Sequence, residues 1–263
     1  MSNHEDYFAL PGINASSIKH GRESMLAMHH AMTTEGGDAT NMRLGRMMHL
    51  AILEPAKLDE VPVIEANTWQ TKAAREALAE ANGHIMLCHE YDRVVKVRDA
   101  VRRNKLARSM VQVMTAEVTI QWDDDIYGKA KARADGINNT AILDVKTTRG
   151  KIDDDTLTRL SWSMGYHLQA GWYCEGAVKS GMIPSTPGFY MLFVQQDEPH
   201  DLRVVRMDTA LVERGRKDAI KIARDYRACE ACGVFPGVDS DQIGVLEAPH
   251  WVDVEEVNME GLS

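Results

Sequence analysis

The stretch from Lys129 to Thr148 constrains the fold more than any other part of this chain. Its sequence, KAKARADGINNTAILDVKTT, predicts two short strands joined by a turn over residues 137–140. Because side chains alternate between the faces of a strand, Asp144 and Lys146 share one face of the second strand. A hairpin closed by this turn brings Asp135 of the first strand next to Asp144. The stretch therefore places two carboxylates and one ammonium on a single surface.

The chemistry of these three side chains indicates a metal-dependent reaction on a phosphate. Two hard oxygen ligands close together suit Mg²⁺ or Mn²⁺. A lysine beside them suits a water molecule that attacks a phosphate. The pattern, an aspartate followed after eight residues by Asp-x-Lys, is what a metal-dependent nuclease needs. We expect Asp135, Asp144 and Lys146 to be catalytic, with the two acids on the metal.

The composition is that of an ordinary globular protein, with 263 residues, 44% of them hydrophobic and 26% charged. This length suits one large α/β domain or two small ones. The formal net charge of −9 argues against a sequence-independent DNA coat. It does not exclude a DNA enzyme, because acidic residues hold metals and phosphate contacts need only a local basic surface.

The sequence also bears on where the protein works. No apolar run is long enough to span a membrane. The first residues, MSNHEDYFALPG, lack the basic and apolar regions of a secretion signal. The four cysteines, at positions 88, 174, 229 and 232, do not resemble a disulfide framework. We expect a protein of the reducing cytoplasm.

Candidate DNA contacts lie on a predicted helix near residue 45, on the first strand of the hairpin and just after its second strand. A solvated surface charge is the alternative for each charged residue in the set. The candidates are Arg43, Arg46, Lys131, Arg133, Thr147 and Arg149.

Two predicted helices and one strand carry further candidates. A helix that starts near Thr40 or Asn41 and ends at Leu53 carries His49 beside its apolar stripe, and the pattern alone favours a structural histidine over a ligand. Gly45, one turn earlier, would allow another backbone to approach. Glu117, on a strand over 115–122, either faces the site or is an edge-strand charge.

A later helix, from about residue 160 to Ser180, carries Gln169 and Tyr173. These residues are four apart and share one face. An amphipathic helix without a chemical role is the alternative.

We expect one domain over residues 1–263. Its first part, 1–114, is mainly helical, with an irregular arm before a helix that runs from Ser16 or Ser17 to about Met32. The sheet and helices of the core follow over 115–233. The tail, 234–263, is largely irregular and is anchored by Pro249–Trp251.

The sequence resembles the nuclease domain of RecE-type exonucleases, in the RecB-like branch of the PD-(D/E)XK nucleases. The resemblance covers most of the chain, and the hairpin together with Gly-x-x-x-His and Gln-x-x-x-Tyr is much more specific than Asp-x-Lys alone. The motifs are LPGINASSI (10–18), LGRMMHLAILEP (44–55), TAEVTIQWDD (115–124), KARADGINNTAILDVKTT (131–148) and HLQAGWY (167–173).

The resemblance implies an α/β fold of the restriction-endonuclease type, with a central mixed sheet flanked by helices and a helical N-terminal region. It implies that His49, Asp135 and Asp144 bind a divalent metal, Mg²⁺ or Mn²⁺, with the main-chain carbonyl of Val145 as a further ligand. Lys146 would lie by the attacking water. Gln169 and Tyr173 would support the site or the DNA strand.

The resemblance also implies an activity and its partners. Such enzymes degrade one strand of double-stranded DNA from an end, 5′ to 3′, and leave a 3′ overhang for a RecT-like single-strand annealing protein. They form a ring-shaped homo-oligomer around DNA. Two alternatives remain open: a structure-specific or restriction-type endonuclease on the same fold, and a DNA-end-binding protein with an inactive site.

Overall fold

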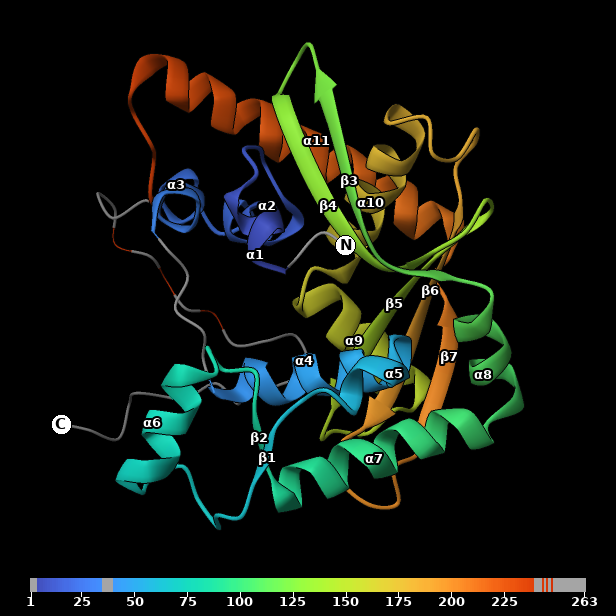
Figure 1. Ribbon diagram of the computed structural model, residues 1–263. Helices are drawn as coiled ribbons and strands as arrows, with labels where there is room; N and C mark the ends of the chain where they lie inside the picture. The colour runs from blue at the N-terminus through green and yellow to red at the C-terminus, as the bar shows by residue number, and fades with distance from the viewer. Residues whose placement is uncertain (1–3, 35–39, 239–242, 244, 246, 248–263) are drawn as a thin grey trace, which may run out of the picture.

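The computed structural model describes residues 4–34, 40–238, 243, 245 and 247. Five strands form a mixed sheet in the order β3-β4-β5-β6-β7 (Figure 1). Strands β5 and β6 are parallel, and the other neighbouring strands are antiparallel. The strands are β3 (Thr115–Asp124), β4 (Gly128–Ile137), β5 (Ala141–Thr148), β6 (Gly188–Gln195) and β7 (Leu202–Arg206).

Helices cover both faces of the sheet, with α10 and α11 above it and α4 and α7 below it in Figure 1. The upper group consists of α2 (Ala15–Gly21), α3 (Met25–Thr33), α9 (Asp154–Ser163), α10 (Tyr166–Lys179) and α11 (Thr209–Cys232). The lower group consists of α4 (Thr40–Leu53), α5 (Pro55–Leu58), α7 (Cys88–Arg103) and α8 (Lys105–Gln112). The remaining elements are α1 (His4–Ala9), α6 (Lys72–Glu80) and a small parallel sheet of β1 (Val63–Ile64) and β2 (Met86–Leu87).

The central strands are apolar on both faces, as a sheet covered on both sides requires. On β5, Ile142 packs into the core under α10, whereas Leu143 and Val145 pack into the second core against α4 and α7. On β6, Phe193 and Leu192 divide between the two cores in the same way. Asp144 lies on the Ile142 side of its strand, so its carboxylate points toward α10.

The sheet divides where β4 leaves β5. The paired positions between these strands are only Ile137 with Ile142 and Gly136 with Leu143. Beyond Gly136, β4 continues as a long hairpin with β3, while β5 continues beside β6. Figure 1 shows the β3–β4 hairpin rising away from β5, β6 and β7. Asp135 and Asp144 stand opposite each other at this fork, one step beyond the last paired position.

Two glycines set the position of α10 against α11. A Cβ on Gly171 would lie 2.1 Å from the main-chain nitrogen of Arg216, and a Cβ on Gly215 would lie 1.8 Å from the carbonyl oxygen of His167. Only glycine permits so close an approach of two helices. The contact fixes α10, which carries Gln169 and Tyr173.

The prediction of a mixed sheet flanked by helices is confirmed, and so is the hairpin over 129–148. Each of two segments that we expected to form one helix forms two helices in the structure. The segment 16–32 breaks before Ser24, which caps α3, and the segment 160–180 breaks at Gly165, whose φ is 65°.

The ends of the chain differ from the expectation in one respect. The arm before residue 15 contains α1, and Ile13 pairs with Ala130 of β4. The predicted anchor at 249–251 lies outside the described residues. Within the described part of the chain, no helix is both long and apolar enough to cross a membrane.

Candidate active site

Asp135 is fixed to the strand that carries the other acid. Its Oδ2 accepts a hydrogen bond of 2.7 Å from the main-chain N–H of Val145, which β4 no longer pairs once the strands diverge. Burial alone would raise the pKa of Asp135, but His49, Lys146 and this N–H together lower it. Asp135 is therefore an oriented, ionised carboxylate.

Asp144 is buried and held from two sides. Gln169 Nε2 donates to its Oδ1 at 2.6 Å, and Lys146 Nζ lies 2.9 Å from Oδ1 and 2.7 Å from Oδ2. Oδ2 accepts no well-aligned hydrogen bond within the described residues. Burial and the negative charge of Asp135 raise the pKa of Asp144, although Lys146 opposes the shift. The sequence prediction that Asp135, Asp144 and Lys146 share one surface agrees with these positions.

Lys146 remains charged at this site. Burial would lower the pKa of its ammonium, but Asp144 and Asp135 raise it. The ammonium also lies 5.1 Å from the ring centre of Tyr166, at the start of α10. A cation held by carboxylates and an aromatic face has a defined orientation.

His49 of α4 reaches the same fork. Its Nδ1 lies 3.5 Å from Asp135 Oδ2. Burial would lower the pKa of His49, but Asp135 raises it. A Cβ on Gly45 would have the hydroxyl of Thr147 as its nearest neighbour, at 3.8 Å, so this glycine does not serve a close backbone approach.

Glu117 is the site residue that the sequence left open. The register of β3 and β4 leaves Glu117 and Asp135 unpaired between two paired positions, so each is the residue across from the other. The backbone φ of Glu117 is 54°, a value that residues other than glycine rarely adopt. Burial and the charge of Asp135 raise the pKa of Glu117, while Arg133, whose Nε is 2.7 Å from the Glu117 carboxylate, opposes the shift. Counting residues away from the turn at 125–127 along both strands would have placed Glu117 across from Asp135.

The donor set fits a divalent cation. Ligand atoms of His49, Glu117 and Asp135 all lie within 4.8 Å of one another. Two carboxylates facing each other across a strand pair repel, and a cation between them removes that repulsion. Asp144 is not a member of this group, and its carboxylate contacts Lys146 and Gln169. The role of Asp144 and of the Val145 carbonyl as ligands stays a prediction.

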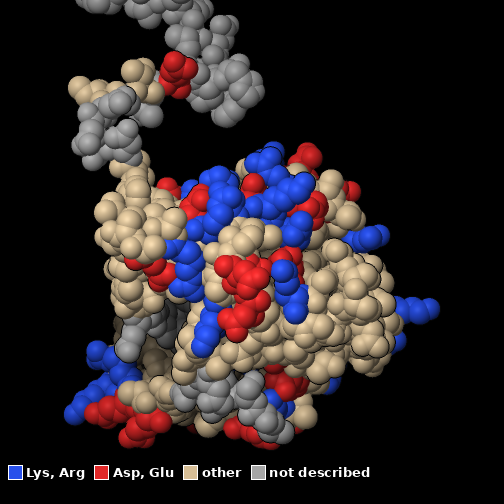
Figure 2. Space-filling model, turned by 90° about the horizontal axis from the view of Figure 1, so that it is seen from above, with Lys and Arg blue, Asp and Glu red and all other residues tan. Residues whose placement is uncertain are grey.

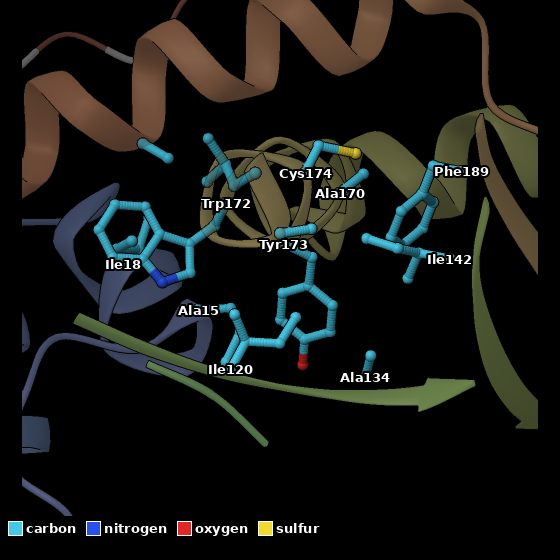
Figure 3. Close-up of a cluster of buried hydrophobic side chains, with 14 of the residues drawn as sticks. Ala15, Ile18, Ile120, Ala134, Ile142, Ala170, Trp172, Tyr173, Cys174 and Phe189 are labelled. Carbon is cyan, nitrogen blue, oxygen red and sulfur yellow. The ribbon is translucent and has the colours of Figure 1, made fainter. Parts of the chain in front are cut away.

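Gln169 and Tyr173 lie on α10 with different surroundings. Gln169 bonds Asp144, and its Oε1 accepts a hydrogen bond of 2.9 Å from Lys19 of α2. Tyr173 is buried in the core, and Figure 3 shows its ring between α10 and strands β3 and β4, with the hydroxyl on the strand side. Burial raises the pKa of this hydroxyl well above its usual range.

Two predicted DNA contacts do not fit their positions. Lys131 is 4% exposed, and its ammonium donates to the carbonyls of Tyr7, Phe8 and Leu10, so it anchors the N-terminal arm. Arg43 is 3% exposed and is held by Glu90 and by the carbonyl of Ile85. Neither charge is available to a phosphate.

The other predicted DNA contacts are nearer the surface. Arg149 is exposed, with Asp197 3.9 Å away, and Thr147 Oγ1 accepts a hydrogen bond from Gln196. Both residues line a polar cleft with His89 and Arg93 of α7. Arg133 is occupied by Glu117, and Arg46 of α4 is half-buried. Their contacts with DNA remain predictions.

Comparison with solved structures shows the fold. A protein from Eubacterium rectale to which an exonuclease activity is ascribed is 13% identical, with a TM-score of 0.65 over 95% of this chain and 96% of that one. A phage-related exonuclease from Haemophilus somnus 129PT is 12% identical, with a TM-score of 0.38 over 85% and 96% of the chains. An alkaline exonuclease from Laribacter hongkongensis is 15% identical, with a TM-score of 0.34 over 87% and 96%.

A family comparison covers most of the chain. No curated protein matches it. A family model matches residues 15–247, a range that includes both acids, Lys146, His49 and Gln169. With the fork of the sheet and the carboxylates placed there, this match identifies the chain as a member of the PDDEXK-like domain family of unknown function, DUF3799.

Proposed function

We propose that this protein is a divalent-metal-dependent exodeoxyribonuclease that degrades one strand of linear double-stranded DNA. The observation that carries the proposal is the meeting of Asp135, Asp144 and Lys146 at the fork of a PD-(D/E)XK fold. Two acids and an imidazole can hold a divalent metal, and an ammonium beside them can orient water, so the set suits the hydrolysis of a phosphodiester.

Each side chain has a role in this proposal. His49 and Asp135 hold Mg²⁺ or Mn²⁺, with Asp144, Glu117 and the Val145 carbonyl as further ligands. When bound, the ion lowers the pKa of a coordinated water and offsets the charge that develops on the phosphate. Lys146 orients the attacking water. Gln169 holds Asp144 in place. Tyr173, on the same helix, packs into the core and so helps to fix the position of α10.

The resemblance to RecE-type exonucleases supports the finer part of the proposal. The enzyme proceeds 5′ to 3′ from an end and leaves a 3′ single strand for a RecT-like annealing protein in recombination. It acts as a ring-shaped homo-oligomer in the cytoplasm, and residues 1–263 work as one nuclease domain.

The test uses linear duplex DNA labelled at the 5′ end in one reaction and at the 3′ end in another, with Mg²⁺ and then with EDTA. Early release of short products from the 5′ label, with the 3′ label still in long strands, supports the proposal. Loss of a supercoiled circle at a comparable rate would point to an endonuclease instead. Binding to DNA without cleavage in Mg²⁺ or Mn²⁺ would contradict an enzymatic role.

A further inference from the structure

The end of α9 and the turn into α10 expose two apolar side chains. Trp162 is 47% exposed and Met164 is 52% exposed. Among the tryptophans of the described residues, Trp162 is the one in an exposed position. Arg22 of α2 contacts Trp162, and Lys19 of the same helix donates to Gln169, which holds Asp144. An exposed aromatic side chain beside a catalytic site indicates a binding surface.

Trp162 is held in a fixed orientation. Its ring lies parallel to that of the buried His167, with 4.3 Å between ring centres and 7° between planes. Arg22, which caps α2, donates to the main-chain carbonyl of Trp162 at 2.7 Å, and its guanidinium lies 5.5 Å from the ring centre. A surface held in this way binds a ligand with little loss of side-chain entropy.

Cations and aromatic rings alternate from this turn into the site. Lys19, one turn before Arg22 on α2, lies 5.1 Å from the ring centre of Tyr166, and Lys146 lies 5.1 Å from the same ring centre. Lys19 also donates to Gln169, and therefore stands one hydrogen bond away from Asp144. We call Lys19, Arg22, Trp162 and Met164 the α2–α9 rim.

The cations of the rim lack carboxylate partners. Neither Lys19 nor Arg22 forms an ion pair with any residue that the structure describes. The basic residues of α11 differ, because Arg214, Arg216 and Lys221 pair with acids of the same helix. The surface that contains α11 carries mixed blue and red side chains in the view from above (Figure 2). Arg22 lies beside the exposed ring of Trp162, and Lys19 lies beside the half-buried ring of Tyr166. Cations and rings in this order match a nucleic-acid strand, whose phosphates and bases alternate in the same way.

We propose that the α2–α9 rim is a subsite for an unpaired nucleotide of the DNA strand next to the scissile phosphate. The base packs against the exposed part of Trp162 and against Met164, and Arg22 and Lys19 contact the phosphates on either side. The proposal rests on the nuclease function proposed above and adds the recognition of a single-stranded segment. It gives the site a preference for a frayed or overhanging end over intact duplex.

The experiment measures binding by fluorescence anisotropy in the Lys146→Ala background with Mg²⁺, so that the DNA stays intact. The probes are a blunt duplex and the same duplex with a short single-stranded overhang. Trp162→Ala weakens binding of the overhang probe about tenfold or more and that of the blunt probe less, as the loss of one base–aromatic contact predicts. Trp162→Phe retains most of the affinity. Leu106→Ala, which removes an exposed side chain of α8, is the control and changes neither.

Two further measurements separate the possible outcomes. Arg22→Gln lowers the slope of log affinity against log salt by about one for the overhang probe, as the loss of one phosphate contact predicts. A 5-iodouracil placed in the overhang cross-links to the peptide that contains Trp162. Equal affinities of the Lys146→Ala protein with and without Trp162→Ala, when the wild-type enzyme cleaves DNA, would overturn the subsite and leave the nuclease intact. A parent protein that neither binds nor cleaves DNA would overturn both.

Discussion

The carboxylate of Asp135 accepts a hydrogen bond of 2.7 Å from the main-chain amide of Val145. This bond joins the strand of the first acid to the strand that carries Asp144 and Lys146 at the point where the ladder between them ends. A side chain thus replaces the missing main-chain partner, and the opening in the sheet becomes the site. The carboxylate needs no further ordering before it binds a cation.

The first prediction concerns Glu117. Replacement by Gln keeps the shape but removes one of the two carboxylates that face each other across β3 and β4. We expect Glu117→Gln to weaken Mn²⁺ binding by about tenfold to a hundredfold, measured by titration calorimetry without DNA. Glu213→Gln on α11 is the matched control, because Glu213 is paired with Arg216 as Glu117 is with Arg133. Unchanged affinity in Glu117→Gln would remove this residue from the metal site.

Arg43 makes the second prediction, which separates structure from DNA binding. Its guanidinium is buried, is paired with Glu90 and lies 4.6 Å from the ring centre of Trp69. Arg43→Ala leaves Glu90 without its cation and lowers the free energy of unfolding by about 3 kcal/mol in urea titrations. DNA affinity of the folded fraction stays within about twofold of wild type. Loss of affinity at unchanged stability would restore Arg43 as a DNA contact.

The pH dependence of stability makes the third prediction. Burial would lower the pKa of His49, but Asp135 raises it above the usual 6.5. The His49–Asp135 pair therefore stabilises the metal-free protein fully below pH 6.5, and this contribution declines as pH rises through the raised pKa.

The measurement compares the free energy of unfolding of wild type and His49→Gln in EDTA at about pH 6 and about pH 9. We expect the advantage of wild type to be larger at the lower pH. His84→Gln, which replaces an exposed histidine between α6 and β2, should show no such trend. An advantage that grows toward high pH would reverse the sign and exclude the pairing.

The close contact of α10 with α11 makes the fourth prediction. A methyl group on Gly171 meets the main-chain nitrogen of Arg216 at 2.1 Å, so the two helices must separate. We expect Gly171→Ala to lower the free energy of unfolding by about 2 kcal/mol. Gly45→Ala on α4 meets only a hydroxyl at 3.8 Å and should be neutral or stabilising by up to about 1 kcal/mol. Equal effects of the two substitutions in urea titrations would show that the close contact of α10 with α11 does not require glycine at position 171.

The sequence predicted the hairpin well because its signals are local. The turn 137–140 and the alternation of β5 determine which residues oppose each other, and Asp135 and Asp144 follow from counting. His49 comes from a separate helix. Its pattern alone favoured a structural role, and only the family resemblance connected it with the acids.

The burial of Arg43 and Lys131 could not be read from the sequence. Lys131 lies on the same face as Arg133, and alternation predicts a shared exposed surface. The N-terminal arm covers Lys131, however, and the carbonyls of the arm accept hydrogen bonds from the Lys131 ammonium. Arg43 is buried because Glu90, forty-seven residues later, comes to lie beside it. Contacts between distant segments decide both cases, and strand or helix periodicity does not report them.

The role of Lys146 is the most direct test of the account. Single-turnover cleavage of end-labelled linear duplex with Mg²⁺ compares wild type with Lys146→Ala. The control is Lys179→Ala, which removes an ion pair with Asp124 at the far end of α10. We predict that Lys146→Ala loses cleavage by about a thousandfold or more while its urea unfolding remains cooperative. Cleavage by Lys146→Ala at the rate of wild type would contradict the assignment of this site as a nuclease centre.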